Sequence, residues 1–93
     1  MIESFADKET EKIAAGDISR KLPWDIQRRA GVKLDQLAAA AVIDDLRIPA
    51  GNRLERLSGD LAAFWSIRIN DQWRIVFRWE NAAAHEVQIT DYH

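Results

Sequence analysis

A chain of 93 residues, 47% hydrophobic and 30% charged, has the size and composition of one globular domain spanning residues 1–93. The formal net charge of −2 excludes a general attraction to nucleic acid, and the lack of cysteine excludes disulfides, thiolate–metal sites and thiol nucleophiles. No apolar run reaches the roughly 18 residues needed to cross a bilayer, and the first residues lack a secretory pattern. These features indicate a small cytoplasmic protein with no membrane partner.

The first half of the chain predicts a short strand and two helices. M-I-E-S-F has the pattern of a short N-terminal strand. Asp7 can cap a helix that runs to about Ala15, and Gly16 is a natural stop. A second helix is expected to begin near Pro23 and to continue towards Asp44. Its apolar stripe, at spacings of three and four residues, consists of Ile26, Ala30, Leu34, Leu37 and Ala41.

The second half predicts an antiparallel meander. Proline and glycine in I-P-A-G-N end the helical pattern, and S-G-D marks a turn. F-W-S-I-R-I-N and Q-W-R-I-V-F-R-W then alternate at period two, and a last strand is expected from about Glu86, with Val87 and Ile89 facing inward. This order predicts an α+β domain in which two helices pack on one face of a small, mainly antiparallel sheet.

The N-D-Q loop fixes the register of the two best strands. A two-residue turn would place Ile67 opposite Arg74 and mix the two faces, because a slip of one residue moves every side chain to the other face. A three-residue loop, 70–72, instead matches Ile67 with Ile75 and places Arg68 across from Arg74. The sheet is therefore predicted to have an apolar face for the helices and an opposite face that carries arginine, amide and hydroxyl groups.

The arginine-rich face allows two interpretations. Every basic residue from Arg47 onward is arginine, whose planar fork suits phosphate and carboxylate groups. Isolated arginines on a sheet are usually solvated and partnered by carboxylates, here Glu55, Asp60 or Asp71, whereas clustered arginines beside Tyr92 and His93 favour an anion site. Both interpretations remain open from the residues alone.

Metal-free cleavage of RNA needs a base, an acid and cations that stabilise the phosphorane. The groups able to exchange protons are the last three residues: Asp91, Tyr92 and His93. Arg74, with Arg68 or Arg56, can hold a phosphate. In the plainer interpretation His93 is an untethered terminal residue and Tyr92 is an edge aromatic. No histidine spacing fits a metal site and no glycine-rich phosphate loop occurs, so no metal or cofactor is predicted.

Three segments in order, G-N-R-L-E-R-L-S-G-D, W-S-I-R-I-N-D-Q-W-R-I-V-F-R-W and I-T-D-Y-H, resemble the HigB toxins of the RelE/ParE superfamily. The resemblance implies a RelE-like microbial RNase fold and a bacterial type II toxin. It further implies a ribosome-dependent endoribonuclease, or mRNA interferase, that cleaves mRNA in the 30S A site. In such enzymes the 2′-hydroxyl attacks the adjacent phosphate and leaves a cyclic phosphate, with no metal. The implied partner is a cognate HigA-like helix-turn-helix antitoxin, through which the toxin reaches operator DNA indirectly.

The resemblance also implies roles for individual residues. Arg74 would stabilise the transition state, Asp91 and His93 would transfer protons, and Tyr92 would orient or stack on the substrate. The residues expected to contact RNA phosphates or the ribosome are Arg53, Arg56, Arg68, Arg78 and Gln72.

Two departures from the pattern and two alternative functions accompany this prediction. Glu55 and Ser58 stand where some relatives have histidine and lysine. Glu55 is a candidate base, but it brings negative charge towards a phosphate, so a weaker nuclease is expected. One alternative is a ParE-like inhibitor of a topoisomerase, because fold alone does not separate the two activities. The other is a co-repressor that acts only through antitoxin binding.

Overall fold

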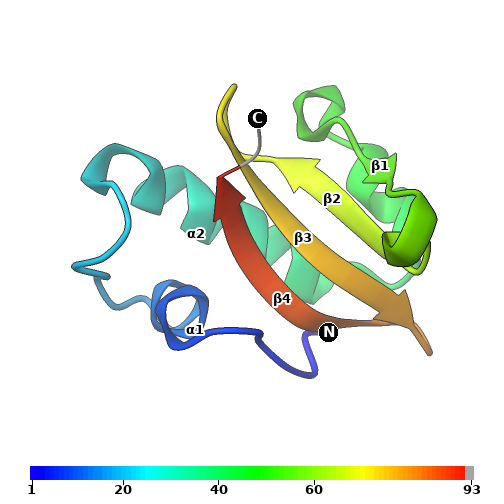
Figure 1. The fold of residues 1–93 in the computed structure, drawn as a ribbon, viewed down its shortest axis with the longest axis horizontal. Helices are drawn as coiled ribbons and strands as arrows, with labels where there is room; N and C mark the ends of the chain where they lie inside the picture. The colour runs from blue at the N-terminus through cyan, green and yellow to red at the C-terminus, as the bar shows by residue number, and fades with distance from the viewer. Residues whose placement is uncertain (92–93) are drawn as a thin grey trace.

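The computed structural model describes residues 1–91, and these form two helices packed against a four-stranded antiparallel sheet (Figure 1). The helices are α1 (Lys8–Ala14) and α2 (Trp24–Ala39). The strands are β1 (Glu55–Arg56), β2 (Phe64–Arg68), β3 (Trp73–Glu80) and β4 (Ala83–Asp91), which pair in that order. Three short 3-10 helices lie between α2 and β2: η1 (Ile43–Arg47), η2 (Ala50–Asn52) and η3 (Gly59–Leu61). The α+β class predicted from the sequence is confirmed.

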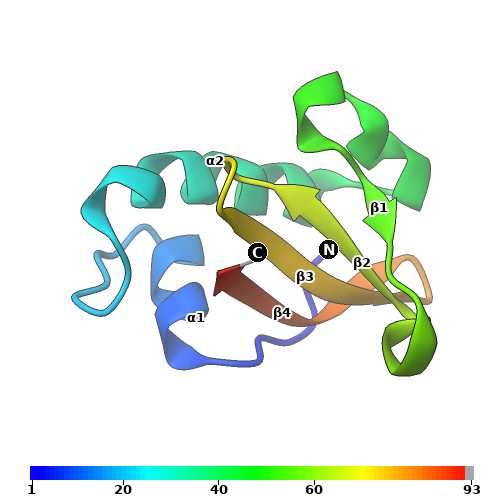
Figure 2. The same cartoon turned by 45° about the horizontal axis from the view of Figure 1, so that its top comes forward.

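Helix α1 begins and ends close to where its capping residues predict. The Asp7 carboxylate accepts a hydrogen bond from the Thr10 N–H at 2.7 Å, and Gly16 follows the helix with a φ of +89°. The fully buried Thr10 hydroxyl accepts a further hydrogen bond from the N–H of Ile89 at 3.0 Å. This bond fixes α1 to β4, beside which the helix lies in Figure 2.

Helix α2 presents its predicted apolar stripe to the core but ends earlier than predicted. Its buried positions are Ile26, Ala30, Leu34 and Leu37, and Ala40 at the C-cap is buried while the predicted Ala41 is exposed. The helix ends at Ala39 because the Asp45 carboxylate accepts hydrogen bonds from two N–H groups just beyond it, at 2.9 and 3.2 Å. The chain then turns into η1, which buries Leu46. These contacts outweigh the helix propensity of the alanine run.

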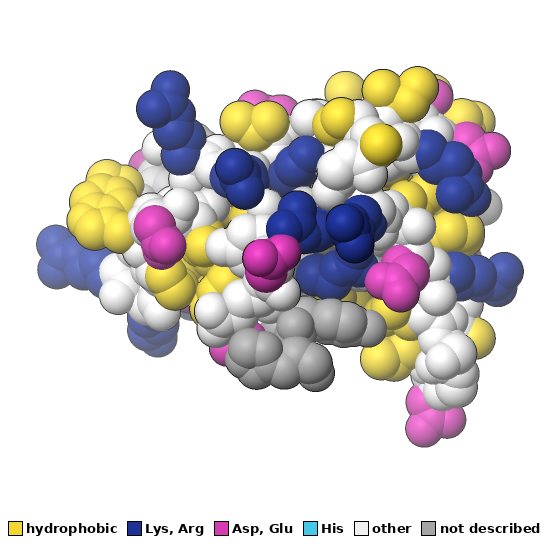
Figure 3. Space-filling model, turned by 90° about the horizontal axis from the view of Figure 1, so that it is seen from above, with side chains coloured by type: hydrophobic (Ala, Val, Ile, Leu, Met, Phe, Trp, Pro, Cys, Tyr) yellow, Lys and Arg dark blue, Asp and Glu magenta, His cyan; other side chains and the backbone are white. Residues whose placement is uncertain are grey.

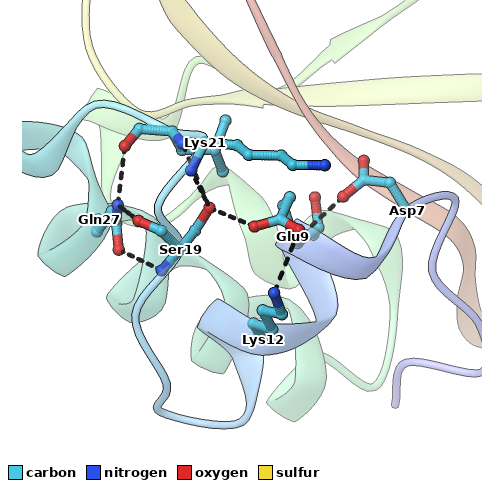
Figure 4. Close-up of polar contacts among 8 residues, drawn as sticks. Asp7, Glu9, Lys12, Ser19, Lys21 and Gln27 are labelled. Carbon is cyan, nitrogen blue, oxygen red and sulfur yellow. Dashed lines mark hydrogen bonds and ion pairs between the residues drawn. The ribbon is translucent and has the colours of Figure 1, made fainter.

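A polar network joins α1 to the start of α2 (Figure 4). The Gln27 amide accepts from the Ser19 N–H at 3.0 Å and donates to the carbonyls of Ser19 and Leu22 at 2.7 and 2.9 Å. The Ser19 hydroxyl donates to Glu9 at 2.6 Å. This hydrogen bond, with a smaller contribution from Lys12, holds the pKa of Glu9 below its ordinary value. The loop between the helices is therefore anchored from both sides.

The register of β2 and β3 is the one predicted from their alternation. Ile67 pairs with Ile75 and Arg68 pairs with Arg74, and the Ile69 N–H donates to the Trp73 carbonyl at 2.9 Å, so residues 70–72 form the turn. Asn70 stabilises this loop, because its side-chain oxygen accepts the N–H groups of Gln72 at 2.9 Å and Trp73 at 2.8 Å. The inward face joins the helices in one core, whose sheet members include Ile67, Ile75, Phe77, Val87 and Ile89.

Strand β4 begins at Ala83, three residues earlier than predicted, because the alanines at its start pair with the end of β3. The β3–β4 register shifts between Val76 and Arg78. At this bulge Glu86 adopts a φ of 53°, and its N–H donates to the Ser4 hydroxyl at 2.9 Å.

The N-terminal segment lies along β4 but does not form the regular strand that was predicted. Ile2 and Phe5 make isolated parallel bridges to Ala84 and Val87. The N–H of Ala84 donates to the Met1 carbonyl at 2.9 Å. The segment therefore covers part of the β4 edge. Within residues 1–91, neither helix has the length and apolar character needed to cross a bilayer.

Candidate functional site

The sheet face opposite the helices carries a row of polar residues at one end. Arg68, Arg74 and Thr90 are consecutive cross-strand partners on β2, β3 and β4, so their side chains share this open face. Figure 3 views this end of the molecule from above and shows Lys and Arg side chains gathered over its middle. The row confirms the predicted separation of an apolar face from a face rich in arginine.

Arg74 is the most constrained group on the open face. The residue is 8% exposed. Its guanidinium donates to the Glu55 carboxylate at 2.6 Å, to the buried Ser66 hydroxyl at 2.8 Å and to the Arg53 carbonyl at 3.0 Å. An arginine in such a cradle is oriented before any ligand arrives, which is the property required of a group that stabilises developing charge.

Glu55 reaches Arg74 because β1 pairs Glu55 with Ser66, which sets both side chains on the open face. The Glu55 side chain is 61% exposed, so its carboxylate can leave Arg74 without moving the core. Just before β1, Arg53 adopts a left-handed backbone with φ 45°, which turns its carbonyl towards the Arg74 guanidinium. Glu55, which departs from the toxin pattern in the sequence, thus bonds directly to Arg74, the residue predicted to stabilise the transition state.

Two of the predicted RNA-binding arginines are engaged elsewhere. Arg56 donates to the Ala62 carbonyl at 2.9 Å and its guanidinium carbon lies 5.8 Å from the Trp65 ring centroid. Arg78 forms ion pairs with Glu80 and Glu86. Because Arg78 is four residues from Arg74 along β3, its Cα lies about 13 Å away. The structure therefore does not bring Arg56 or Arg78 to the Arg74 cluster.

The N-D-Q loop and the end of β4 meet beside Arg74. The Gln72 amide donates to the Asp91 carboxylate at 3.1 Å. Asp91 pairs with Trp73 and adjoins Thr90, so alternation directs it to the face opposite the Arg74 side chain, at the same end of the sheet. The other two residues of the predicted catalytic ending, Tyr92 and His93, lie outside the described residues.

Arg68 extends the basic region towards α2. It forms an ion pair with Asp71, and this hydrogen bond and charge hold the pKa of Asp71 below its ordinary value. Arg29 and Lys33 on α2 line a hollow of about 270 Å³ together with Arg68. Sequence reasoning missed both α2 cations. The available signal was their i,i+4 spacing, which places them on one face of the helix.

Two buried polar residues that the sequence analysis also missed support this region. Ser66 holds Arg74, as described above, and Asn52 holds η1 and α2 together. The Asn52 amide donates to the Gln36 side chain and the Leu46 carbonyl, both at 3.1 Å, and its oxygen accepts from Lys33. Among residues 1–91, no group of three or more His, Cys, Asp or Glu side chains has an arrangement suited to a metal ion.

Two helices on a four-stranded antiparallel sheet whose open face ends in a basic cluster form the architecture of a RelE-like toxin domain. A family model described as the RelE-like toxin of the type II toxin–antitoxin system HigB matches residues 3–93. The chain is 42% identical over 81 residues to Toxin HigB-1 of Vibrio cholerae, covering 86% of this chain and 85% of that protein. The chain belongs to the HigB family of type II toxins.

Two further relatives extend this comparison. Endoribonuclease HigB of Proteus vulgaris is 29% identical over 93 residues, which is the full length of both chains. An uncharacterised protein of Haemophilus influenzae is 38% identical over 66 residues, which is 71% of this chain and 65% of that protein. The family resemblance seen in the sequence motifs is therefore confirmed.

Proposed function

We propose that this toxin is an endoribonuclease that cleaves mRNA in the ribosomal A site and so inhibits translation. The observation that carries the proposal is the pre-oriented Arg74 guanidinium on the open sheet face, with Arg68 across from it. The similarity to a full-length relative named as an endoribonuclease supports the same activity.

The proposed chemistry is transfer of the phosphate to the neighbouring 2′-hydroxyl. The 2′-oxygen attacks phosphorus, its proton passes to a base on the toxin, and the bond from phosphorus to the 5′-oxygen breaks as that oxygen gains a proton. The products are a 2′,3′-cyclic phosphate and a free 5′-hydroxyl. Asp91 and His93 are proposed to transfer the protons, and Tyr92 to position the substrate; for Asp91 this role requires its side chain, at the end of β4, to turn from the other sheet face towards Arg74.

Arg74 is proposed to bind the equatorial oxygens of the phosphorane. Its donor to Glu55 must then turn to the phosphate, and the exposed Glu55 carboxylate withdraws into water. The bonds to Ser66 and to the Arg53 carbonyl remain and keep the guanidinium plane fixed. Gln72 is proposed to orient Asp91 through their hydrogen bond.

The proposed partners follow from membership of the toxin–antitoxin class. A cognate helix-turn-helix antitoxin neutralises the toxin in the cytoplasm and carries it to operator DNA. The ribosome supplies the A site in which the mRNA is held.

The test maps the ends of a defined mRNA after incubation with purified toxin, with and without ribosomes. Wild-type toxin should produce new 5′-hydroxyl ends only when ribosomes are present. Arg74→Gln should lose at least about 100-fold in cleavage rate, as removal of a positioned donor does elsewhere. Arg47→Gln, which removes an exposed arginine paired with Asp44 on η1, is the matched control. Wild-type growth inhibition without any new RNA ends would favour the inhibitor of a protein target.

A further inference from the structure

A groove runs along α2 where the helix passes the end of β2. Its volume is about 580 Å³, and its walls include Arg29, Lys33 and Ile69. The adjoining hollow of about 270 Å³ shares these three residues and adds Gly51 and Arg68. We call the cluster of Arg29, Lys33 and Arg68 the α2 notch. Figure 3 shows the basic side chains on this end of the molecule.

The α2 notch concentrates like charge, and among residues 1–91 only one of its three cations forms an ion pair, Arg68 with Asp71. Lys33 is partly withdrawn from water, and this desolvation, followed by the charges of Arg29 and Arg68, holds its pKa below the ordinary value. Among residues 1–91, no carboxylate forms an ion pair with Arg29 or Lys33, although Asp25 lines the far part of the groove. An anion bound among these cations would relieve their repulsion.

The side chains of the α2 notch are held in position by the fold. The Arg29 guanidinium donates to the Ile69 carbonyl at 3.3 Å, and the Lys33 amine donates to the buried Asn52 side chain. Each interaction uses a neutral oxygen and so leaves the positive charge in place. Donors that are pre-oriented in this way lose less entropy when a ligand binds.

The α2 notch also lies next to Arg74. Strand β1 pairs only with Ser66 and Trp65 of β2, so its pairing stops before Arg68, which lines the hollow with Gly51 of η2 and with Arg29 and Lys33 of α2. The Cα of Arg68 is about 5 Å from that of Arg74, its cross-strand partner. A strand of RNA that crosses Arg74 therefore passes Arg68 and then reaches Arg29 and Lys33 on α2. Among residues 1–91, neither of these two α2 cations is ion-paired to a carboxylate.

We propose that the α2 notch is a second phosphate-binding site, which holds an RNA backbone phosphate next to the linkage bound by Arg74. The inference rests on the proposed endoribonuclease function for the identity of the ligand as RNA. Arginine and lysine donors suit phosphate oxygens, and the path from the β2 edge to Arg74 favours a continuous nucleic-acid strand over a compact acidic peptide. Arg29 and Lys33 act in binding and do not touch the reacting atoms.

The experiment measures binding of a fluorescent 12-nucleotide 2′-O-methyl RNA by anisotropy, so that cleavage does not contribute. The double variant Arg29→Gln with Lys33→Gln should raise Kd by about tenfold, as expected for loss of one charge-assisted contact. The slope of log K against log salt should fall by about 0.7, the value for one phosphate on a single strand. Lys33→Arg should retain wild-type affinity, and thermal melting checks that each variant is folded.

The control and competitor make the outcome decisive. Arg20→Gln with Lys21→Gln removes the same two positive charges from the exposed segment between α1 and α2 and should leave Kd and slope unchanged. Equal affinity and equal salt slope for the double variant and wild type would overturn the proposal. The competitor is a glutamate-rich 12-residue peptide. If binding of this peptide depends on the α2 notch while binding of the RNA does not, the site serves an acidic protein and the proposal is overturned.

A second arm uses ribosomes without mRNA. If the double variant loses affinity for the short RNA, the phosphate belongs to the mRNA strand. If it loses affinity only for ribosomes, the phosphate belongs to ribosomal RNA, and the proposal that the α2 notch holds a phosphate next to the linkage at Arg74 is overturned. The proposed nuclease activity is tested separately, by comparing the RNA ends produced by wild type and Arg74→Gln. If that activity is not found, the binding measurement can still be interpreted.

Discussion

Replacing Glu55 by glutamine should strengthen RNA binding, because the carboxylate competes with phosphate for Arg74. The substitution keeps an oxygen that can accept from the guanidinium, so the 2.6 Å contact is kept while the negative charge is lost. Although Arg74 is buried, the Glu55 side chain is 61% exposed, and we therefore use the value for an exposed ion pair, about 0.2–1 kcal/mol. This energy corresponds to an affinity gain of up to about fivefold.

The assay is anisotropy with the 2′-O-methyl RNA at low salt, with Glu80→Gln as the matched control. Glu80 pairs with Arg78 at the other end of β3, so its loss should have little effect on RNA held at Arg74. Unchanged or weaker RNA binding by Glu55→Gln would refute the competition argument.

Single-turnover cleavage at saturating toxin tests the other candidate role of Glu55, that of a general base. Removal of a general base typically costs about 10²–10⁴ in rate. We expect a loss smaller than tenfold, because the carboxylate is directed at Arg74. A loss of 100-fold or more would assign the base role to Glu55.

Three other substitutions test the site and its supports. Arg74→Lys keeps the charge but loses the fork that contacts Ser66, so cleavage should fall about 10²–10³-fold while the melting curve stays cooperative; wild-type cleavage would contradict the role of the fork. Asn52→Ala removes a fully buried amide that makes three hydrogen bonds. Urea denaturation should show that the free energy of unfolding falls by about 1–3 kcal/mol. An unchanged free energy of unfolding would mean that these bonds contribute nothing to stability. Glu9→Gln tests linkage to pH: the folded pKa of Glu9 is lowered mainly by the Ser19 hydrogen bond, so its stabilisation is present above the ordinary value and lost as pH falls through the folded value. Wild type should therefore melt above Glu9→Gln at neutral pH, with the difference closing in acid, and a difference that widens in acid would reverse the assignment.

The register of β2 and β3 could be predicted because their alternation excludes a two-residue turn. Pairing Ile67 with Ile75 keeps the alternating apolar residues of the two strands on one face, whereas a slip of one residue would mix the faces. The position of Arg68 across from Arg74 followed directly. Strand β1 could not be predicted, since Glu55 and Arg56 are too few and too polar to show a period.

The end of α2 and the start of β4 were predicted less well, for different reasons. Alanine favours a helix, but a single carboxylate, that of Asp45, ended α2 by bonding the N–H groups beyond it. At β4, alanine has low strand propensity, yet Ala83 and Ala84 pair because β3 and the N-terminal segment lie on either side of them. Both outcomes depend on tertiary partners.

The structure places Arg74 beside Arg68 as alternation predicted. Glu55 was one of three carboxylates expected to partner the arginine face, but alternation did not indicate which arginine it would contact. Nor did it show that Arg78 would be occupied by two glutamates. The α2 notch joins residues about 40 positions apart in the chain, which a local pattern does not bring together.

The parallel bridges between the N-terminal segment and β4 bear on how the toxin is made in the cell. Ser4 and Glu86 are joined across 82 positions of the chain, so residues 2–5 are synthesised long before the residues that they contact. The sheet cannot be completed until residues 83–91 have been translated. A nascent chain therefore lacks the strand that carries Asp91 throughout most of its own synthesis.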